Sequence, residues 1–268
     1  MILRRVMERL RKQEWTAITI EFLIVVLGVF LGLQANNWNQ AAIDHRAEAT
    51  YLSQLRSDLQ RIEGTVRDQI EFEQFQGRVA GTVFDLIEHD RTAERGRRIG
   101  MGLSQLTMRR TLRMESPTFT DLQSSGNLEI ISDPALRAEI ISYFFFTRRL
   151  EAVIDKNNES FVDDGWLAFV RSAGVPAARW DDQVMRMQAP GVVWRVNGAL
   201  GDEIYGGPLF QSQSALLASA PNAPSWAPVV TQLTWRAHVA AVNGSTAQRL
   251  LEVTSALEAR VAGRVDRR

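Results

Sequence analysis

Residues 15–35 read WTAITIEFLIVVLGVFLGLQA, and this stretch decides the architecture of the chain. It carries one charged residue, Glu21, and it is as long as the roughly 20 residues that an α-helix needs to cross a bilayer. Trp15 and Trp38 bracket it, at the places where aromatic side chains gather at the two membrane interfaces. The sequence therefore predicts a membrane-spanning helix with Trp15 and Trp38 as its interface residues.

The charges around this span predict its orientation. Five basic residues precede it, whereas Arg46 is the only one between the span and Arg56. Basic residues stay on the cytoplasmic side of a single span, so we expect a cytoplasmic N-terminus and an exterior chain after Asn36. A cleaved signal peptide is the alternative. Against it, the apolar run is long and LGLQANNWN at 31–39 lacks a small-x-small cleavage site, which favours an uncleaved anchor.

The composition argues against several classes of function. The 268 residues carry 31 basic and 31 acidic side chains, so we expect no nucleic-acid partner. Cysteine is absent, which excludes disulfides, thiolate metal sites and cysteine nucleophiles. The motifs of nucleotide-binding loops, serine hydrolases, zinc proteases and calcium loops are missing, and the three histidines are isolated from one another. We therefore expect no enzyme, no cofactor and no metal site.

The apolar pattern after the span predicts helices. A three-four alternation, typical of an amphipathic helix, runs through Leu52, Leu55, Leu59, Ile62 and Val66. Ser116-Pro117 and Asp133-Pro134 each join an N-cap residue to a proline at the first helical position, and Gly126 is expected to end the first of these helices. The aromatic run 143–146 indicates a buried core. By contrast, RTAERGRRIG at 91–100 is typical of a charged loop.

The C-terminal part changes character. Half of the eight prolines lie from Pro190 to Pro224, where we expect loops, with a short strand at 192–196 and a brief helix at 211–218. From Ser225, a capping residue, the pattern predicts a final helix or helix pair with Gly244 as the candidate break.

The expected fold class is mainly α, with an N-terminal transmembrane helix followed by an extracytoplasmic helical bundle that has a loop-rich insertion. The expected parts are a cytoplasmic tail at 1–14, a transmembrane anchor at 15–38, a helical bundle domain at 39–175, a loop-rich segment at 176–224 and a C-terminal helix or helix pair at 225–268 that packs on the bundle.

Small residues in the span predict a contact with another membrane helix. Gly28 and Gly32 form a GxxxG pair, which lets a second helix approach closely. Counting by helical turns places them on one stripe with Glu21 and Ala35. Glu21 itself has two interpretations: it extends to the cytoplasmic interface, or it faces a polar group on a partner helix.

Several stretches resemble an uncharacterised bacterial family of single-pass membrane proteins, DUF6090. They are Glu21–Gly28 and Leu33–Asn39 of the anchor, then Tyr51-Leu52, Leu55 and Asp58-Leu59, and the central run of Thr118, Leu122, Ser125–Leu128, Ile131, Leu136 and Tyr143. The resemblance covers about the first 60% of the chain. It implies a bacterial inner-membrane protein with a periplasmic C-terminal domain, and it implies no catalytic residues.

These observations lead to two functional hypotheses. In the first, the protein is bound to the lipid bilayer and acts by association, as a homo-oligomer or as an accessory subunit of a larger membrane assembly. In the second, a ligand-binding or sensory module signals through a membrane partner and uses a surface of Trp180, Trp194, Tyr205 and Trp226. The alternative interpretation of these aromatic residues is that they cover the end of the bundle.

Overall fold

The computed structural model of the protein describes residues 2–180, 205, 207–211 and 214–266, apart from the side chains of residues 2–18, 208 and 211. The described residues are mainly helical and contain no strand, which confirms the mainly α expectation. The elements are α1 (Ile2–Glu88), α2 (Arg95–Gln105), α3 (Pro117–Ser124), the 3-10 helix η1 (Asn127–Ile130), α4 (Pro134–Asn157), the π-helix η2 (Asn158–Leu167), α5 (Ala168–Ser172), the 3-10 helices η3 (Pro208–Gln211) and η4 (Pro224–Trp226), and α8 (Ala227–Val265).

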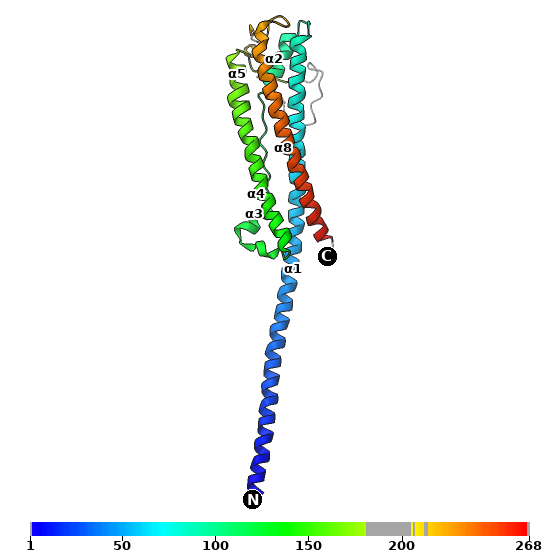
Figure 1. The fold of residues 1–268 in the computed structure, drawn as a ribbon, viewed down its shortest axis with the longest axis vertical. Coiled ribbons are helices and arrows are strands. Elements are labelled where there is room, and N and C mark those ends of the chain that lie inside the picture. The colour runs from blue at the N-terminus through cyan, green and yellow to red at the C-terminus, as the bar shows by residue number, and fades with distance from the viewer. Residues whose placement is uncertain (1, 181–204, 206, 212–213, 267–268) are drawn as a thin grey trace.

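A single helix, α1, joins the apolar span to the rest of the molecule. Its N-terminal part projects as a free rod, and its C-terminal part lies beside α4 and α8 (Figure 1). From Thr19 to Arg46 every side chain except Gln34 is exposed, and Glu48 is the first buried one. Among the described residues, α1 is the one helix long and apolar enough to cross a membrane. We call the described residues from Glu48 onward the body.

The capping signals are confirmed. The Ser116 hydroxyl accepts a hydrogen bond from the Phe119 backbone N–H at 3.1 Å, and α3 then begins at Pro117. Asp133 accepts from two backbone N–H groups at the start of α4. Gly126 follows α3 with a φ of 73°, in the left-handed region that glycine adopts readily.

The charged stretch 91–100 is the expected loop only at 91–94, because α2 begins at Arg95. The Arg95 guanidinium is buried and donates to the carbonyls of Leu86 at 3.0 Å and Ile87 at 2.9 Å, so it satisfies groups that the end of α1 leaves unpaired. A Cβ at Gly96 would lie 2.7 Å from the Leu217 carbonyl oxygen, so this close approach requires glycine.

The C-terminal helix also differs from expectation. α8 runs through Gly244 without a break, and its N-cap residue is Trp226 rather than Ser225. A Cβ at Gly244 would lie 3.5 Å from the Glu73 Cβ, an ordinary van der Waals distance, so this glycine faces α1 without being required there by the packing. Residues 215–218 form turns instead of a helix, and the expected strand at 192–196 lies outside the described residues.

Two hydrophobic clusters fill the body, and α1 and α8 contribute to both. The first lies nearer the free rod and includes Leu55, Leu59, Phe119, Phe144 and Leu250. The second lies at the far end and includes Phe75, Val83, Trp166, Trp180 and Trp226. Of the aromatic run 143–146, only Tyr143 and Phe144 are buried, while Phe145 is 57% exposed, so the expectation of burial holds for half of it.

Truncating a side chain of the first cluster should destabilise the body. Leu55 is fully buried on α1, so Leu55→Ala should lower the free energy of unfolding by about 2–5 kcal/mol, through lost burial and the cavity it leaves. Denaturant unfolding of the full chain in detergent, followed by circular dichroism, measures this. The neighbouring exposed Gln54 provides the control, since Gln54→Ala should change the value by less than about 0.5 kcal/mol. Equal losses in the two variants would contradict this account of the core.

Candidate functional site

The residues predicted for helix packing lie on the projecting part of α1. Glu21, Gly28, Gly32 and Ala35 are all exposed, and a Cβ at either glycine would meet nothing within 4 Å. Trp38 is 68% exposed. Trp15 lies within α1, but its side chain is outside the described ones. Their roles in the membrane stay predictions.

Two of the four aromatic residues predicted to form a ligand or partner surface are buried instead. Trp180 and Trp226 are 3% and 2% exposed and belong to the second cluster. Trp180 packs edge-on against Phe75, and Trp226 lies beneath the Arg95 guanidinium. Burial of these large side chains supports the alternative interpretation, that they close the end of the body. Tyr205 is half-buried, and Trp194 lies outside the described residues.

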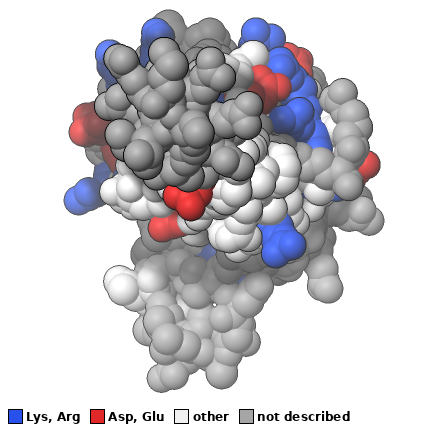
Figure 2. Space-filling view, turned by 90° about the horizontal axis from the view of Figure 1, so that it is seen from below, with Lys and Arg blue, Asp and Glu red and all other residues white. Residues whose placement is uncertain are grey.

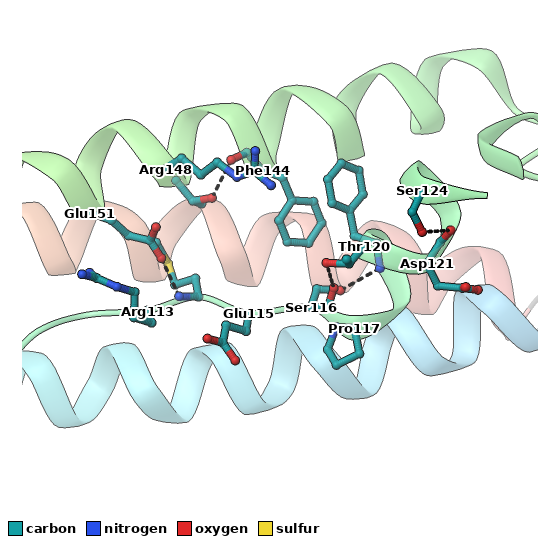
Figure 3. A pocket seen from close by; sticks show the side chains of 13 residues that line it. Arg113, Glu115, Ser116, Pro117, Thr120, Asp121, Ser124, Phe144, Arg148 and Glu151 are labelled. Carbon is teal, nitrogen blue, oxygen red and sulfur yellow. Dashed lines mark hydrogen bonds between the residues drawn. The ribbon is translucent and has the colours of Figure 1, made fainter. Parts of the chain in front are cut away.

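A pocket of about 600 Å³ opens between α3, α4 and the segment that precedes α3 (Figure 3). The rings of Phe119 and Phe144 stack at 4.1 Å and form its apolar floor. Its walls carry charges of both signs, from Arg113, Arg148, Glu115, Asp121 and Glu151. The pocket could accept a partly apolar molecule, but its walls favour neither an anion nor a cation.

Polar groups behind the pocket hold its walls in place. Asp58 of α1 accepts hydrogen bonds from the Ser116 hydroxyl at 2.8 Å and the Thr118 backbone N–H at 3.0 Å. Burial alone would raise the Asp58 pKa, but these bonds and the nearby Arg61 lower it. Glu151 accepts from the Met114 backbone N–H. These carboxylates act as structural acceptors, and the described residues contain no group of acidic or histidine side chains that could hold a metal.

A second candidate is a polar layer between the two hydrophobic clusters, which we define as Gln69, Glu73 and Gln76 of α1, Arg236 and Asn243 of α8, and Asn157 and Asn158 where α4 passes into η2. All are buried except the half-buried Asn157. Glu73 Oε1 accepts from Gln69 at 2.8 Å and from Asn243 at 3.3 Å. Asn243 also donates to Asn158 and accepts from Asn157, so the layer joins three helical segments.

Several atoms of this layer lack a hydrogen-bond partner among the described residues. They are Gln69 Oε1, Glu73 Oε2, both side-chain polar atoms of Gln76, and Arg236 Nη1. Leaving one such buried group unpaired costs about 1–3 kcal/mol. The layer therefore carries an energetic cost that the two hydrophobic clusters do not, which makes it a candidate for function rather than for stability.

Burial sets the ionisation of the two charged residues in the layer. Burial of Glu73 raises its pKa to about 7, against the opposing effects of Arg236, Asn243 and Gln69. Burial likewise lowers the Arg236 pKa, and Glu73 opposes that shift. Arg236 donates to the carbonyls of Leu106 and Met108, so its charge has fixed partners besides Glu73. This layer was not predicted from the sequence. One signal for it is present, since Gln69, Glu73 and Gln76 continue the three-four stripe of Leu59, Ile62 and Val66.

Removing Asp58 should destabilise the α3 wall of the pocket. Asp58→Ala leaves the Ser116 hydroxyl and the Thr118 N–H without their acceptor, so the free energy of unfolding should fall by about 1–3 kcal/mol. Because the folded state lowers the Asp58 pKa, this contribution is complete above its ordinary value of 3.8 and is lost as pH falls through the lower folded-state pKa. Denaturant titrations at several pH values measure both effects.

The control for this variant is Asp68→Ala, which removes an exposed α1 carboxylate paired with Arg110 at 3.3 Å. Exposed ion pairs contribute at most about 1 kcal/mol. A loss as large for Asp68→Ala as for Asp58→Ala would show that the bonds behind the pocket have no special role.

Comparison of the chain with protein-family models, with curated proteins and with solved structures finds no match. The resemblance to the bacterial membrane-protein family therefore stays a prediction.

Proposed function

We propose that the protein is anchored in a bacterial inner membrane by α1 and acts by association, as a homo-oligomer or as a subunit of a larger membrane assembly. In this proposal the N-terminus is cytoplasmic and the body is periplasmic. The exposed apolar part of α1 and the charges on either side of it support the anchor. About 15 Å of exposed helix between Trp38 and Glu48 would separate the body from the membrane interface.

The proposal of association depends on one observation: the face of α1 that carries the glycines of the span is also the face that the body leaves exposed. Gly28 and Gly64 are separated by about ten turns at roughly 3.6 residues per turn, so they share one face. Ser53 and Ser57 lie within roughly 20° of that face, and both are exposed. Side chains on the opposite face, such as Leu55 and Ile62, are buried in the first cluster. The body therefore leaves uncovered the same face of α1 that carries the small residues of the span.

This uncovered face, which we call the association face, consists of small and uncharged residues over most of its length: Gly28, Gly32, Ala35, Asn39, Ala42, Ser53, Ser57 and Gly64. Small side chains let two helices approach closely. Arg46 interrupts the face just outside the span. Beyond Gly64 it becomes acidic at Asp68 and Glu71, and like charges would repel each other in a parallel pair. We therefore place the contact on the two uncharged stretches of this face, from Gly28 to Ala42 and from Ser53 to Gly64, on either side of Arg46.

Charge is mixed on the face of the body that is seen from below. Seen from below, basic and acidic side chains both lie around the molecule (Figure 2). Anionic lipids attract clusters of basic residues, and a mixed surface lacks that attraction. The pocket at α3 supports the second hypothesis, ligand binding, but two of the aromatic residues first assigned to that role are buried in the core.

Single cysteines should distinguish the association face from other surfaces, because the chain has no cysteine of its own. In native membranes, Ser57→Cys should form a disulfide-linked dimer under mild oxidation, detected on a non-reducing gel. Ser245→Cys is a matched control: both serines are exposed, lie within a helix and donate to the carbonyl four residues earlier. Equal crosslinking at the two positions would exclude α1 as the contact between copies.

A bulky residue in the span should weaken the same contact. Gly28→Leu, made in the Ser57→Cys protein, should reduce dimer formation several-fold because the helices can no longer approach closely. Val26→Leu adds apolar volume on roughly the opposite face of α1 and should leave dimer formation unchanged. If Gly28→Leu has no effect either, the glycines are not part of the contact.

The proposed orientation predicts which reporters work at the C-terminus. A reporter active only in the periplasm should be active when fused after Arg268, and one active only in the cytoplasm should be silent, because basic residues are concentrated before the span. The reverse pattern would overturn the topology while leaving the association face untested by that experiment.

A further inference from the structure

We propose that the polar layer is a proton-binding site, centred on the Glu73 carboxylate, that regulates how tightly α8 and η2 hold α1. Glu73 lies on the face of α1 opposite to Gly64, half a turn away after about two and a half turns. The site is therefore separate from the association face, and the proposal does not depend on how the protein associates.

The geometry around Glu73 makes this carboxylate suited to bind a proton. Its Oε1 accepts two hydrogen bonds, while its Oε2 has no partner among the described residues. The side chain is 2% exposed, so water does not compensate an ionised form as it would at the surface. Protonation converts Oε2 into a donor within a layer that contains unpartnered acceptors on Gln69 and Gln76.

Among the described residues, one other charge faces Glu73 from the elements that surround it. From α8 this is Arg236, and Asn243 beside it is neutral. The α1 neighbours Gln69 and Gln76 and the η2 residue Asn158 carry no charge. Arg236 attracts the ionised carboxylate, but desolvation outweighs this attraction and the pKa of Glu73 rises to about 7. The fold therefore favours the protonated form relative to an exposed glutamate.

The elements that contact Glu73, η2 and α8, can change their packing when its charge changes. Asn158, the first residue of the π-helix η2, donates to the Arg110 carbonyl and accepts from Asn243, so it joins η2 to α8. π-helical turns are rare and often mark functional positions. When Glu73 loses its proton, a buried negative charge remains between α1 and α8, and local opening of α8 and η2 exposes it to water. The contact is thus tighter at low pH and looser at high pH.

Hydrogen exchange of the full chain in detergent, followed by mass spectrometry at pH 6 and pH 8, tests the site. With a pKa of about 7 in the closed state and an ordinary 4.5 in the open state, linkage predicts local opening about tenfold more frequent at pH 8. After correction for the intrinsic exchange rate, peptides covering Arg236–Ala247 and η2 should show this increase. Peptides of the first cluster around Leu55 serve as the internal reference.

Two variants make the test specific to the carboxylate. Glu73→Gln is neutral at both pH values and should abolish the increase. Glu71→Gln removes an exposed carboxylate two residues away on the same helix and should retain it. A tenfold increase that persists in Glu73→Gln, or no increase in the wild type, would overturn the proposal.

A measurement on the wild type alone covers the case in which Glu73→Gln does not fold. The infrared carbonyl band of a protonated carboxylic acid should titrate with a midpoint near pH 7 in the intact protein. If no carboxylic-acid band titrates near neutral pH, the proposal is wrong. If such a band does titrate and the exchange of α8 and η2 follows the same midpoint, the proposal is supported.

Discussion

The packing of α8 against α1 is the contact on which the rest of the structure depends. Both helices supply residues to the two hydrophobic clusters, and the polar layer lies between those clusters. The remaining elements attach to this pair: the buried Asp58 of α1 receives the start of α3, and Tyr143 of α4 forms a 2.9 Å hydrogen bond with Thr254 of α8. A chain without disulfides depends on such burial for its stability.

Because α1 is one uninterrupted helix, it links the packing of the body to the orientation of the span. In a continuous helix the angular position of each residue is fixed relative to every other residue. The face of α1 that α8 leaves uncovered therefore continues as one particular face of the span. A flexible linker after Trp38 would have removed that relation. The continuous helix is thus the physical reason why the small residues of the span and those at Ser53 and Ser57 can belong to one contact surface.

The polar layer and the association face make different demands on the same helix. The layer places a carboxylate that burial disfavours inside the contact with α8, and the association face keeps the other side of α1 free of bulky side chains. In the proposals made here, the first regulates contacts within one chain and the second joins chains. They are independent because they lie about half a turn apart.

Features that depend on neighbouring residues could be predicted from the sequence: the apolar span, the helix starts at Pro117 and Pro134, the left-handed turn at Gly126 and the mainly helical class. Features that depend on distant partners became visible only in the folded protein. Arg95 looks like a solvated loop residue, yet it is buried because the end of α1 supplies carbonyls to it. Gly244 looks like a helix break, yet it lies inside α8 and faces Glu73 across the contact with α1. In the sequence, Glu73 resembles any surface glutamate. It is enclosed by Arg236 and Asn243, which lie more than 150 residues later in the chain. Its burial therefore arises only when the helices pack.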